Sequence, residues 1–211
     1  MGKVLVIGAN SFIAKHVISK LDQLGIQSLL TTRATLNIEE EDSIKSFCVS
    51  NVDTFDSILF FQGINPSLNT KDMTSEHFKK MLNVNLVGPT LLLKHLYNSI
   101  NRGAMLLFIS SIASRKGSYD PSYASAKAGI TGLTNSLATE FSDFRFNTIS
   151  LGLVEDSPVF DQMTPDFRKK HSDGMNGGFI QKEDVSTAII ELIQNKSINR
   201  AQLNIDRGFK N

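Results

Sequence analysis

The sequence predicts a doubly wound α/β fold, in which helices cover both faces of a mostly parallel sheet. Short apolar runs of strand length alternate along the chain with longer segments that carry apolar residues at helical spacing, and this is the pattern of repeated strand–helix–strand units. The first run, residues 3–7, is apolar throughout after its lysine, as expected for a strand that is buried on both faces. The length of 211 residues favours a single domain over residues 1–211.

The first half of the chain predicts three strands that alternate with three helices. Apolar residues recur near the 3.6-residue period from Phe12 to Leu24, which predicts a helix over residues 11–24 that ends at Gly25. The other elements predicted in this half are strands at 26–32 and 57–61, a short helix at 43–49 and a long helix at 76–101.

The second strand–helix unit is too short to be complete. Residues 32–37 lead directly into the short helix, whereas a full crossover with its helix needs at least about 10–12 residues. We therefore expect the crossover helix and the third strand of this unit to be abbreviated or missing.

The second half of the chain continues the alternation up to one irregular stretch. Asp120 as N-cap and Pro121 at the first helical position open a helix. The other elements predicted here are strands at 104–109, 145–150 and 202–205 and a helix at 183–194. Between them, residues 155–178 lose the apolar pattern. Because ligands bind beyond the carboxyl ends of parallel strands, we interpret this segment as a substrate lid; the alternative is a mobile surface loop.

Composition excludes several classes of protein. The chain has 22 Lys and Arg against 21 Asp and Glu, so its net charge of +1 attracts neither nucleic acid nor an anionic membrane. The single cysteine, Cys48, cannot form an intrachain disulfide. No apolar run is long enough to span a bilayer and no leader precedes Lys3, so we expect a soluble, cytoplasmic protein.

The histidines do not predict a metal site. All four lie far apart in the sequence, without the paired spacing of metal ligands, and we expect them to have helix-surface or loop roles. They are His16, His77, His95 and His171.

A tyrosine and a lysine carry the first chemical signal. Tyr123 and Lys127 stand four residues apart near the start of a predicted helix, and such residues share one helical face. A nearby ammonium favours the phenolate and lowers a phenol pKa from ~10 towards neutrality, so that the tyrosine can exchange a proton with a carbonyl or an alcohol. A serine at the end of the preceding strand, Ser110 or Ser111, could hydrogen-bond the same oxygen.

The turn after the first strand is a weaker signal. A glycine turn that leads into a helix lets backbone N–H groups and the helix N-terminus hold a pyrophosphate. Here Gly8 is the only glycine of the turn, and many parallel sheets turn at this point without a ligand. The turn alone supports a structural turn and a cofactor site equally.

Several ordered segments together resemble the short-chain dehydrogenase/reductase family, over essentially the whole chain. These segments are Lys3-Val-Leu-Val-Ile-Gly8, Met81-Leu-Asn-Val-Asn-Leu-Val-Gly88, Phe108-Ile-Ser-Ser111, Tyr123-Ala-Ser-Ala-Lys-Ala-Gly129, Arg145-Phe-Asn-Thr-Ile-Ser-Leu-Gly152 and Asn204-Ile-Asp-Arg-Gly-Phe209. The resemblance implies a Rossmann-type, NAD(P)-binding domain that acts on a carbonyl or an alcohol.

The resemblance implies four catalytic residues. Tyr123 would be the acid/base, and Lys127 would orient the nicotinamide ribose and lower the tyrosine pKa. Ser111 would polarise the carbonyl, and Asn85 would hold a water molecule in a proton relay; otherwise Asn85 is a polar helix residue that caps or bridges its neighbours. Ser110 fits the family's usual spacing to the tyrosine, but we prefer Ser111 because the family's Ile-Ser-Ser normally uses its second serine.

The resemblance also implies the cofactor-binding positions, which are Gly8, Asn10, Ser11, Phe12, Ile13, Arg33, Asn37, Gly63, Tyr123, Lys127 and Val154. The pair Phe12 and Ile13 matches the turn of the sugar-modifying branch, Gly-Ala-Thr-Gly-Phe-Ile-Gly. In that register we expect Phe12 to face the protein, while the Ser11 N–H faces phosphate.

Arg33 decides the expected cofactor. An acidic residue at this point suits the ribose 2′-hydroxyl of NAD, and an arginine suits the 2′-phosphate of NADP. No carboxylate lies between residues 26 and 37, so we expect NADP(H) rather than NAD(H). The alternative is that Arg33 is a solvated loop charge.

These implications predict an NADP(H)-dependent oxidoreductase that interconverts a carbonyl and a secondary alcohol of a small molecule. Two alternatives stay open: a nucleotide-binding regulator that has lost catalysis, suggested by the altered glycine turn, and a sugar epimerase or dehydratase, suggested by Phe12 and Ile13. Because the family frequently pairs its long helix and its active-site helix across an interface, we expect a homodimer or homotetramer.

Overall fold

The computed structural model describes residues 2–176 and 178–209 and contains a sheet with the strand order β2-β1-β3-β4-β5-β6. Every neighbouring pair of strands in it is parallel. The strands are β1 (Val4–Ile7), β2 (Ser28–Thr31), β3 (Phe55–Phe60), β4 (Ile100–Ser111), β5 (Arg145–Leu151) and β6 (Gln202–Ile205). The predicted parallel α/β fold is confirmed.

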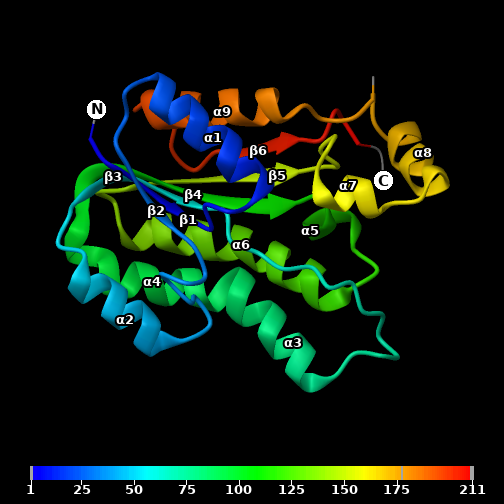
Figure 1. The fold of residues 1–211 in the computed structure, drawn as a ribbon, viewed down its shortest axis with the longest axis horizontal. Helices are drawn as coiled ribbons and strands as arrows, with labels where there is room; N and C mark the ends of the chain where they lie inside the picture. The colour runs from blue at the N-terminus through cyan, green and yellow to red at the C-terminus, as the bar shows by residue number, and fades with distance from the viewer. Residues whose placement is uncertain (1, 177, 210–211) are drawn as a thin grey trace.

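Helices cover both faces of the sheet (Figure 1). One face carries α1 (Phe12–Gln23) and α9 (Lys182–Gln194), and the other carries α2 (Glu41–Ser50), α4 (Gly88–Leu96) and α6 (Pro121–Glu140). Within β1, Val4 and Val6 belong to the core under α1 and α9, while Leu5 and Ile7 belong to the opposite core. Because both faces are buried, the strand is apolar along its whole length.

The abbreviation of the second unit is confirmed. Among the described residues β2 is the outermost strand at its edge, and α2 connects it directly to β3, which pairs with β1. The chain thus changes direction across the sheet at β1. The crevice beside the carboxyl end of β1 is where open parallel sheets bind their ligands.

The helix predicted over residues 76–101 is present with two differences: it contains a widened turn, and it ends at Ser99, where β4 follows. The structure has α3 (Ser75–Leu82), a π-helical turn η1 (Asn83–Val87), α4 and a 3-10 turn η2 (Tyr97–Ser99) before β4 begins. Pro89 explains the widened turn, because it has no N–H for the carbonyl of Asn85 and its ring clashes with that carbonyl in a regular helix. Single π turns frequently occur at functional sites, and Asn85 lies in this one.

The segment 155–178 is more regular than predicted in its described part, which leaves out residue 177. It contains α7 (Pro158–Gln162) and α8 (Pro165–Asp173), whose N-caps are Ser157 and Thr164. Each cap precedes a proline, and this combination is a helix-start signal that the periodicity argument overlooked. A further short helix, α5 (Ala113–Lys116), follows β4. In the described ranges, every helix is too short or too polar to cross a membrane.

Candidate active site

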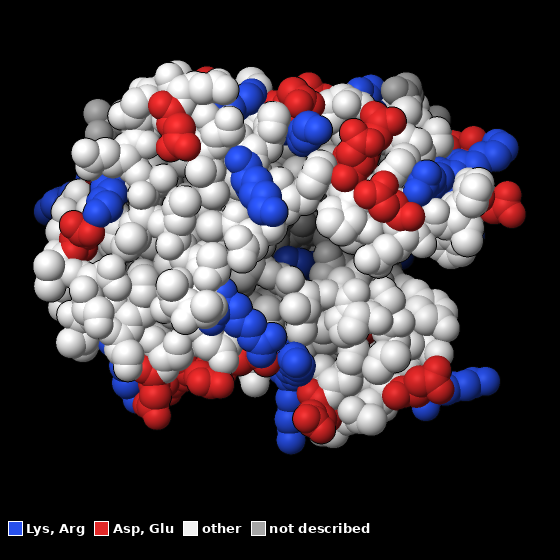
Figure 2. All heavy atoms as spheres, in the orientation of Figure 1, with Lys and Arg blue, Asp and Glu red and all other residues white. Residues whose placement is uncertain are grey.

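The carboxyl ends of β1, β3, β4 and β5 meet at one edge of the sheet, and the segments that follow them build the candidate site. The strand ends and these segments contribute the Gly8 turn, Gly63, Ser111 and Val154. The surface is hollowed between the part that carries α7 and α8 and the part that carries α3, and a basic side chain lies in the hollow (Figure 2). Around it, charges of both signs are interspersed over this face.

Helix α6 brings Tyr123 and Lys127 together, as their spacing predicts. The Lys127 Nζ lies 5.8 Å from the centroid of the Tyr123 ring and donates a 2.9 Å hydrogen bond to the carbonyl of Ile109 in β4. Lys127 is buried, and this burial lowers its pKa to about 8. The ammonium is therefore still protonated at neutral pH, but it loses its proton more readily than an exposed lysine.

The pKa of Tyr123 contradicts the sequence-based expectation. Burial raises this pKa above its ordinary value, and a hydrogen bond with Ser111 offsets only part of the rise. The lowering of this pKa that was expected from Lys127 is not met in the ligand-free protein, because desolvation of the phenolate dominates. Tyr123 therefore keeps its proton at neutral pH.

The two neighbouring serines of β4 have different partners. Ser111 lies beside the Tyr123 phenol, whose pKa its hydroxyl lowers, and it accepts a hydrogen bond of 3.1 Å from the Ala113 N–H. Ser110 is buried and donates to the Lys127 carbonyl at 2.9 Å, since successive residues of a strand point to opposite faces. The geometry therefore favours Ser111 over Ser110 as the hydroxyl that faces a substrate.

Asn85 presents an unpartnered oxygen to the site. Its amide donates to the Met81 carbonyl at 3.0 Å and to the Ile64 carbonyl at 3.2 Å, while its Oδ1 is buried without a hydrogen-bond partner among the described residues. A Cβ at Gly63 would lie 3.0 Å from this oxygen and 3.5 Å from the Lys127 Nζ. The space at Gly63, between an acceptor and an ammonium, suits a water molecule or a ligand hydroxyl.

The turn after β1 leaves no room for a side chain at Gly8. This residue has a φ of +78°, and a Cβ there would lie 2.8 Å from the backbone nitrogen of Gln62. Phe12 packs against the core under α1 and α9, so it faces the protein as expected, while Asn10 is exposed in the turn. The close approach of two backbones explains the glycine.

One expectation for this turn is wrong. The Ser11 N–H does not face the site, because it donates to the Gly8 carbonyl at 3.0 Å. The Ser11 hydroxyl instead caps α1 and accepts from the Ala14 N–H at 3.2 Å. The first N–H groups of a helix have no acceptor within it, so those of Phe12 and Ile13 are the donors that remain for an anion.

Arg33 and Asn37 lie on the loop after β2, beside carboxylates that the sequence analysis missed. The exposed Arg33 guanidinium forms a 2.9 Å ion pair with Glu39, and the Asn37 amide donates to Glu40 at 2.8 Å. Both glutamates lie just beyond residues 26–37, the stretch that contains no carboxylate. Arg33 is thus partnered in the structure.

Val154 lies at the base of the lid segment. It is buried and pairs with Ile180 in an isolated parallel bridge, and the next residue, Glu155, donates its N–H to the Ile180 carbonyl at 2.9 Å. The chain therefore leaves the edge of the sheet at Val154 and returns beside it at Ile180. The helices α7 and α8 lie between these two residues.

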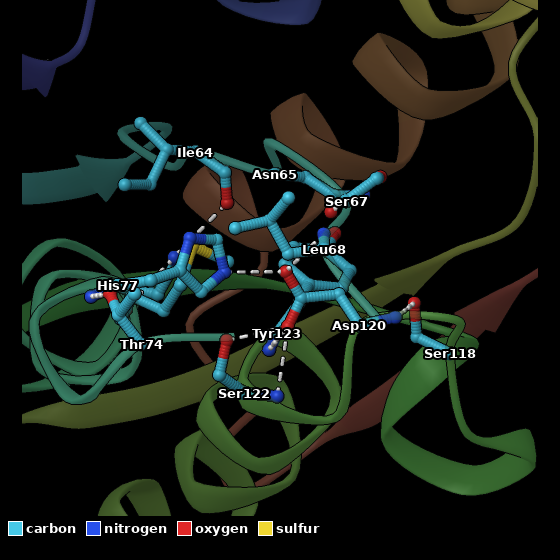
Figure 3. Close-up of polar contacts among 12 residues, drawn as sticks. Ile64, Asn65, Ser67, Leu68, Thr74, His77, Ser118, Asp120, Ser122 and Tyr123 are labelled. Atoms are coloured by element: carbon cyan, nitrogen blue, oxygen red, sulfur yellow. Dashed lines mark hydrogen bonds and ion pairs between the residues drawn. The ribbon is translucent and has the colours of Figure 1, made fainter. Parts of the chain in front are cut away.

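Asp120 and His77 form a pair that no sequence signal indicated. Asp120 is fully buried, and its Oδ2 lies 2.8 Å from the His77 Nε2 (Figure 3). Burial raises the pKa of Asp120, but hydrogen bonds from Ser122 and His77 outweigh it and the net pKa is lowered. The expected helix-surface or loop role of His77 is wrong, because its ring contacts a buried carboxylate. No sequence pattern indicates this contact, since 43 residues separate the two and only the fold brings them together.

The residues at this edge fit a nicotinamide dinucleotide. Helix α1 offers N–H donors beside a glycine turn, as the phosphates of such a cofactor require. The gap at Gly63 offers the Asn85 oxygen and the Lys127 ammonium to a hydroxyl group, and ribose carries hydroxyl groups. The donors and acceptors therefore match the parts of a dinucleotide.

Comparison with known proteins gives the family. A family model described as Enoyl-(Acyl carrier protein) reductase matches residues 4–210. The chain belongs to the short-chain dehydrogenase/reductase family of oxidoreductases.

Curated relatives agree at low identity. Cyclohexanol dehydrogenase of Acinetobacter sp. (strain SE19) is 25% identical over 196 residues, which cover 90% of this chain and 77% of the relative. The short-chain dehydrogenase/reductase FrzI of Cladobotryum sp is 27% identical over 147 residues, which cover 69% of this chain and 56% of the relative. The chain spans between half and two thirds of the length of several relatives that it matches, with coverages of 56% to 59%.

Solved structures share the whole architecture. A small-chain dehydrogenase crystallised in complex with NADPH superposes with a TM-score of 0.87 at 23% identity, over 98% of this chain and 97% of that one. The protein lin1944 from Listeria innocua superposes with a TM-score of 0.83 at 20% identity, over 97% of this chain and 100% of that one. At these identities the likeness establishes the fold.

Proposed function

We propose that this protein is an NADP(H)-dependent oxidoreductase that interconverts a carbonyl and a secondary alcohol of a small molecule. The observation that carries the proposal is the meeting of Tyr123, Ser111, Lys127 and Asn85 at the edge of the sheet that also holds the Gly8 turn. A bound nicotinamide dinucleotide supplies the hydride. The chain supplies the proton, orients the cofactor and the substrate, and surrounds the reacting groups with a partly desolvated site.

Tyr123 delivers the proton in this proposal. Its raised pKa keeps the phenol protonated at neutral pH, and a protonated phenol can donate to a carbonyl oxygen as the carbonyl carbon is reduced. Ser111 lies beside the same phenol and donates a second hydrogen bond to that oxygen as negative charge develops there. The protonation state of the free protein thus supports carbonyl reduction.

Lys127 and Asn85 assist from the two sides of the gap at Gly63. Anionic ligand groups near Lys127 favour its charged form, which opposes the effect of its burial. Asn85 is held by two backbone carbonyls, so its free Oδ1 is fixed towards the gap. We propose that a water molecule there returns a proton to Tyr123 after each turnover.

We expect Gly63→Ala to reduce turnover without loss of the fold, because the added methyl group fills this gap. The kcat for a carbonyl substrate should fall about 10-fold, as displacement of reacting groups predicts, with little change in the thermal midpoint. Gly132→Ala in α6 is the matched control, since a Cβ there would meet nothing within 4 Å. Equal kcat values for the two variants would contradict a role for the gap.

The preference for NADP(H) rests on Arg33, and titration of both cofactors tests it. We expect NADPH to bind more tightly than NADH, and Arg33→Gln to weaken NADPH binding alone by about 10-fold, the size of one charge-assisted hydrogen bond. Glu39→Gln should strengthen NADPH binding, because it frees the guanidinium. Cofactor fluorescence is a suitable readout, since the chain has no Trp.

A second exposed ion pair provides the control for this titration. Arg102 pairs with Asp143 at 2.9 Å, at the amino-terminal ends of the strands and away from the Gly8 turn, so Arg102→Gln should leave both affinities unchanged. Tighter binding of NADH by the unmodified protein would overturn the assignment of Arg33.

We also propose that residues 155–178 are the substrate lid of a single domain over residues 1–211. The helices α7 and α8 lie beyond the carboxyl end of β5 (Figure 1). Phe160 and Met175 form a small apolar cluster with Leu153, and Phe179 packs against it, which offers an apolar wall to a substrate. The homodimer or homotetramer stays a prediction.

A further inference from the structure

We propose that His77 and Asp120 are a buried positioning pair that fastens the rim of the active site to the helix that carries Tyr123. The rim segment is defined as residues 64–74, which connect Gly63 to α3. The kinetic part of this inference rests on the proposed oxidoreductase function, whereas its structural part does not.

Asp120 connects three separate segments with one carboxylate. Its Oδ1 caps α6 by accepting from the backbone N–H groups of Ser122 at 2.9 Å and Tyr123 at 3.2 Å. Its Oδ2 accepts from the Leu68 N–H of the rim at 3.2 Å and lies 2.8 Å from the His77 Nε2 of α3 (Figure 3). An N-cap needs only the first of these oxygens, so the second is available to tie the rim and α3 to α6.

Three contacts of the rim segment lead to a proposed catalytic residue or to this pair, and a further one joins Asn69 to the exposed Tyr119 hydroxyl at 3.0 Å. At its start, the Ile64 carbonyl accepts from the Asn85 amide at 3.2 Å. In its middle, Leu68 donates to Asp120. At its end, Thr74 accepts from the His77 N–H at 3.1 Å and caps α3. Movement of Asp120 therefore affects both the rim and the start of α6.

His77 has the chemistry to keep this carboxylate ionised and in place. Because the pKa of Asp120 is lowered, its Oδ2 is an acceptor and the His77 Nε2 must carry the hydrogen. A buried carboxylate that loses a donor is strongly destabilised, and it recovers by drawing in water or by moving towards the surface. Either response weakens the hydrogen bond that the Tyr123 N–H donates to Asp120. We expect water then to reach the Tyr123 phenol.

Two substitutions at residue 77 separate the hydrogen bond from the bulk of the ring. His77→Gln keeps an N–H donor at a similar reach, and His77→Leu removes the donor but keeps an apolar side chain. Asp120→Asn adds a third variant, because Asn is an equally good N-cap but turns a donor towards Leu68 or His77. The matched control is His95→Leu, since His95 contacts the carboxylate of Glu41 at 3.0 Å between α4 and α2, away from the site.

Two measurements need no substrate. Hydrogen exchange of the rim should accelerate in His77→Leu and Asp120→Asn by about 10-fold or more, the effect of losing a hydrogen bond to a charged group, and should stay protected in His77→Gln and His95→Leu. The second measurement is the ionisation midpoint of Tyr123, which tyrosinate absorbance gives with Tyr123→Phe as the reference. This midpoint should fall towards the ordinary tyrosine value in His77→Leu and Asp120→Asn. A merely structural contact would change the thermal midpoint without moving this titration.

Steady-state kinetics complete the test. The substrates are NADPH and whichever ketone or aldehyde of a substrate panel the unmodified protein reduces fastest. We expect kcat to fall about 10- to 100-fold in His77→Leu with the KM for NADPH nearly unchanged, and His77→Gln to restore it. Unchanged rim exchange and Tyr123 titration in His77→Leu, or a His77→Gln variant as impaired as His77→Leu, would overturn the positioning pair. An unmodified protein that reduces no carbonyl would overturn the proposed function, and the two substrate-free measurements would still decide the pair.

Discussion

Replacement of Tyr123 by Phe is expected to lower kcat by about 10³- to 10⁴-fold, since general acid–base catalysis contributes up to this amount. The variant removes one oxygen from a partly buried ring and leaves the contacts of α6 in place, so the binding constant for NADPH should change less than about twofold. The measurement is the rate of NADPH oxidation with a carbonyl substrate, together with a cofactor titration.

Tyr97→Phe provides the control for this loss, because Tyr97 is 46% exposed and packs beside Phe141 and Phe144. It should keep full turnover. If Tyr123→Phe retained a substantial share of the activity, the proton would have to come from another group and the assigned role would be wrong.

Lys127→Met is expected to produce a protein that is more stable but nearly inactive. Turnover should fall by about 10²- to 10³-fold, the usual cost of one preorganised charge. The pKa of Lys127 is lowered to about 8 by burial, which means that the folded state disfavours the charged form. Removal of the ammonium should therefore raise the thermal midpoint at neutral pH by a few degrees, since a gain of about 1 kcal/mol has this effect.

The pH dependence of that gain follows from the direction of the shift. The folded-state pKa of Lys127, about 8, lies below the unfolded value of about 10.4, so its burial destabilises the folded protein fully below pH 8 and progressively less above it. The stability advantage of Lys127→Met should hence shrink as the pH rises from about 8 to about 10. Lys79→Met on the exposed face of α3 is the control, and a methionine variant at residue 127 that is less stable at neutral pH would contradict this reasoning.

The strands of the sheet were predictable because burial on both faces requires a continuous apolar run in the sequence. Runs such as residues 4–7 are apolar throughout, and each predicted strand is present. The strand at 202–205 has the predicted bounds and the others have shifted ends; β4 is the largest difference, since it extends from Ile100 to Ser111. The helix start at Asp120 was visible because capping involves residues a few positions apart, whereas the helix that begins at Phe12 was predicted from its periodicity. The π turn at Asn85 was not visible, because periodicity does not show that Pro89 widens the turn before it.

The candidate site was predictable only where its residues are close in sequence. The Tyr123–Lys127 pair follows from helix geometry, whereas the contact of Asp120 with His77 spans 43 residues and leaves no pattern in one sequence. The sign of the Tyr123 pKa shift was wrong for a related reason. The sequence shows a neighbouring charge, but it does not show the desolvation that outweighs it.

The central claim, that this site reduces a carbonyl with the proton of Tyr123, is tested most directly by hydride transfer from NADPH deuterated at nicotinamide C4. The account predicts that the unmodified protein places deuterium on the carbinol carbon of a product alcohol, and that Tyr123→Phe binds the same cofactor without forming the labelled product. Tight binding of NADPH by the unmodified protein with no labelled alcohol from any aldehyde or ketone would contradict it and favour a nucleotide-binding regulator.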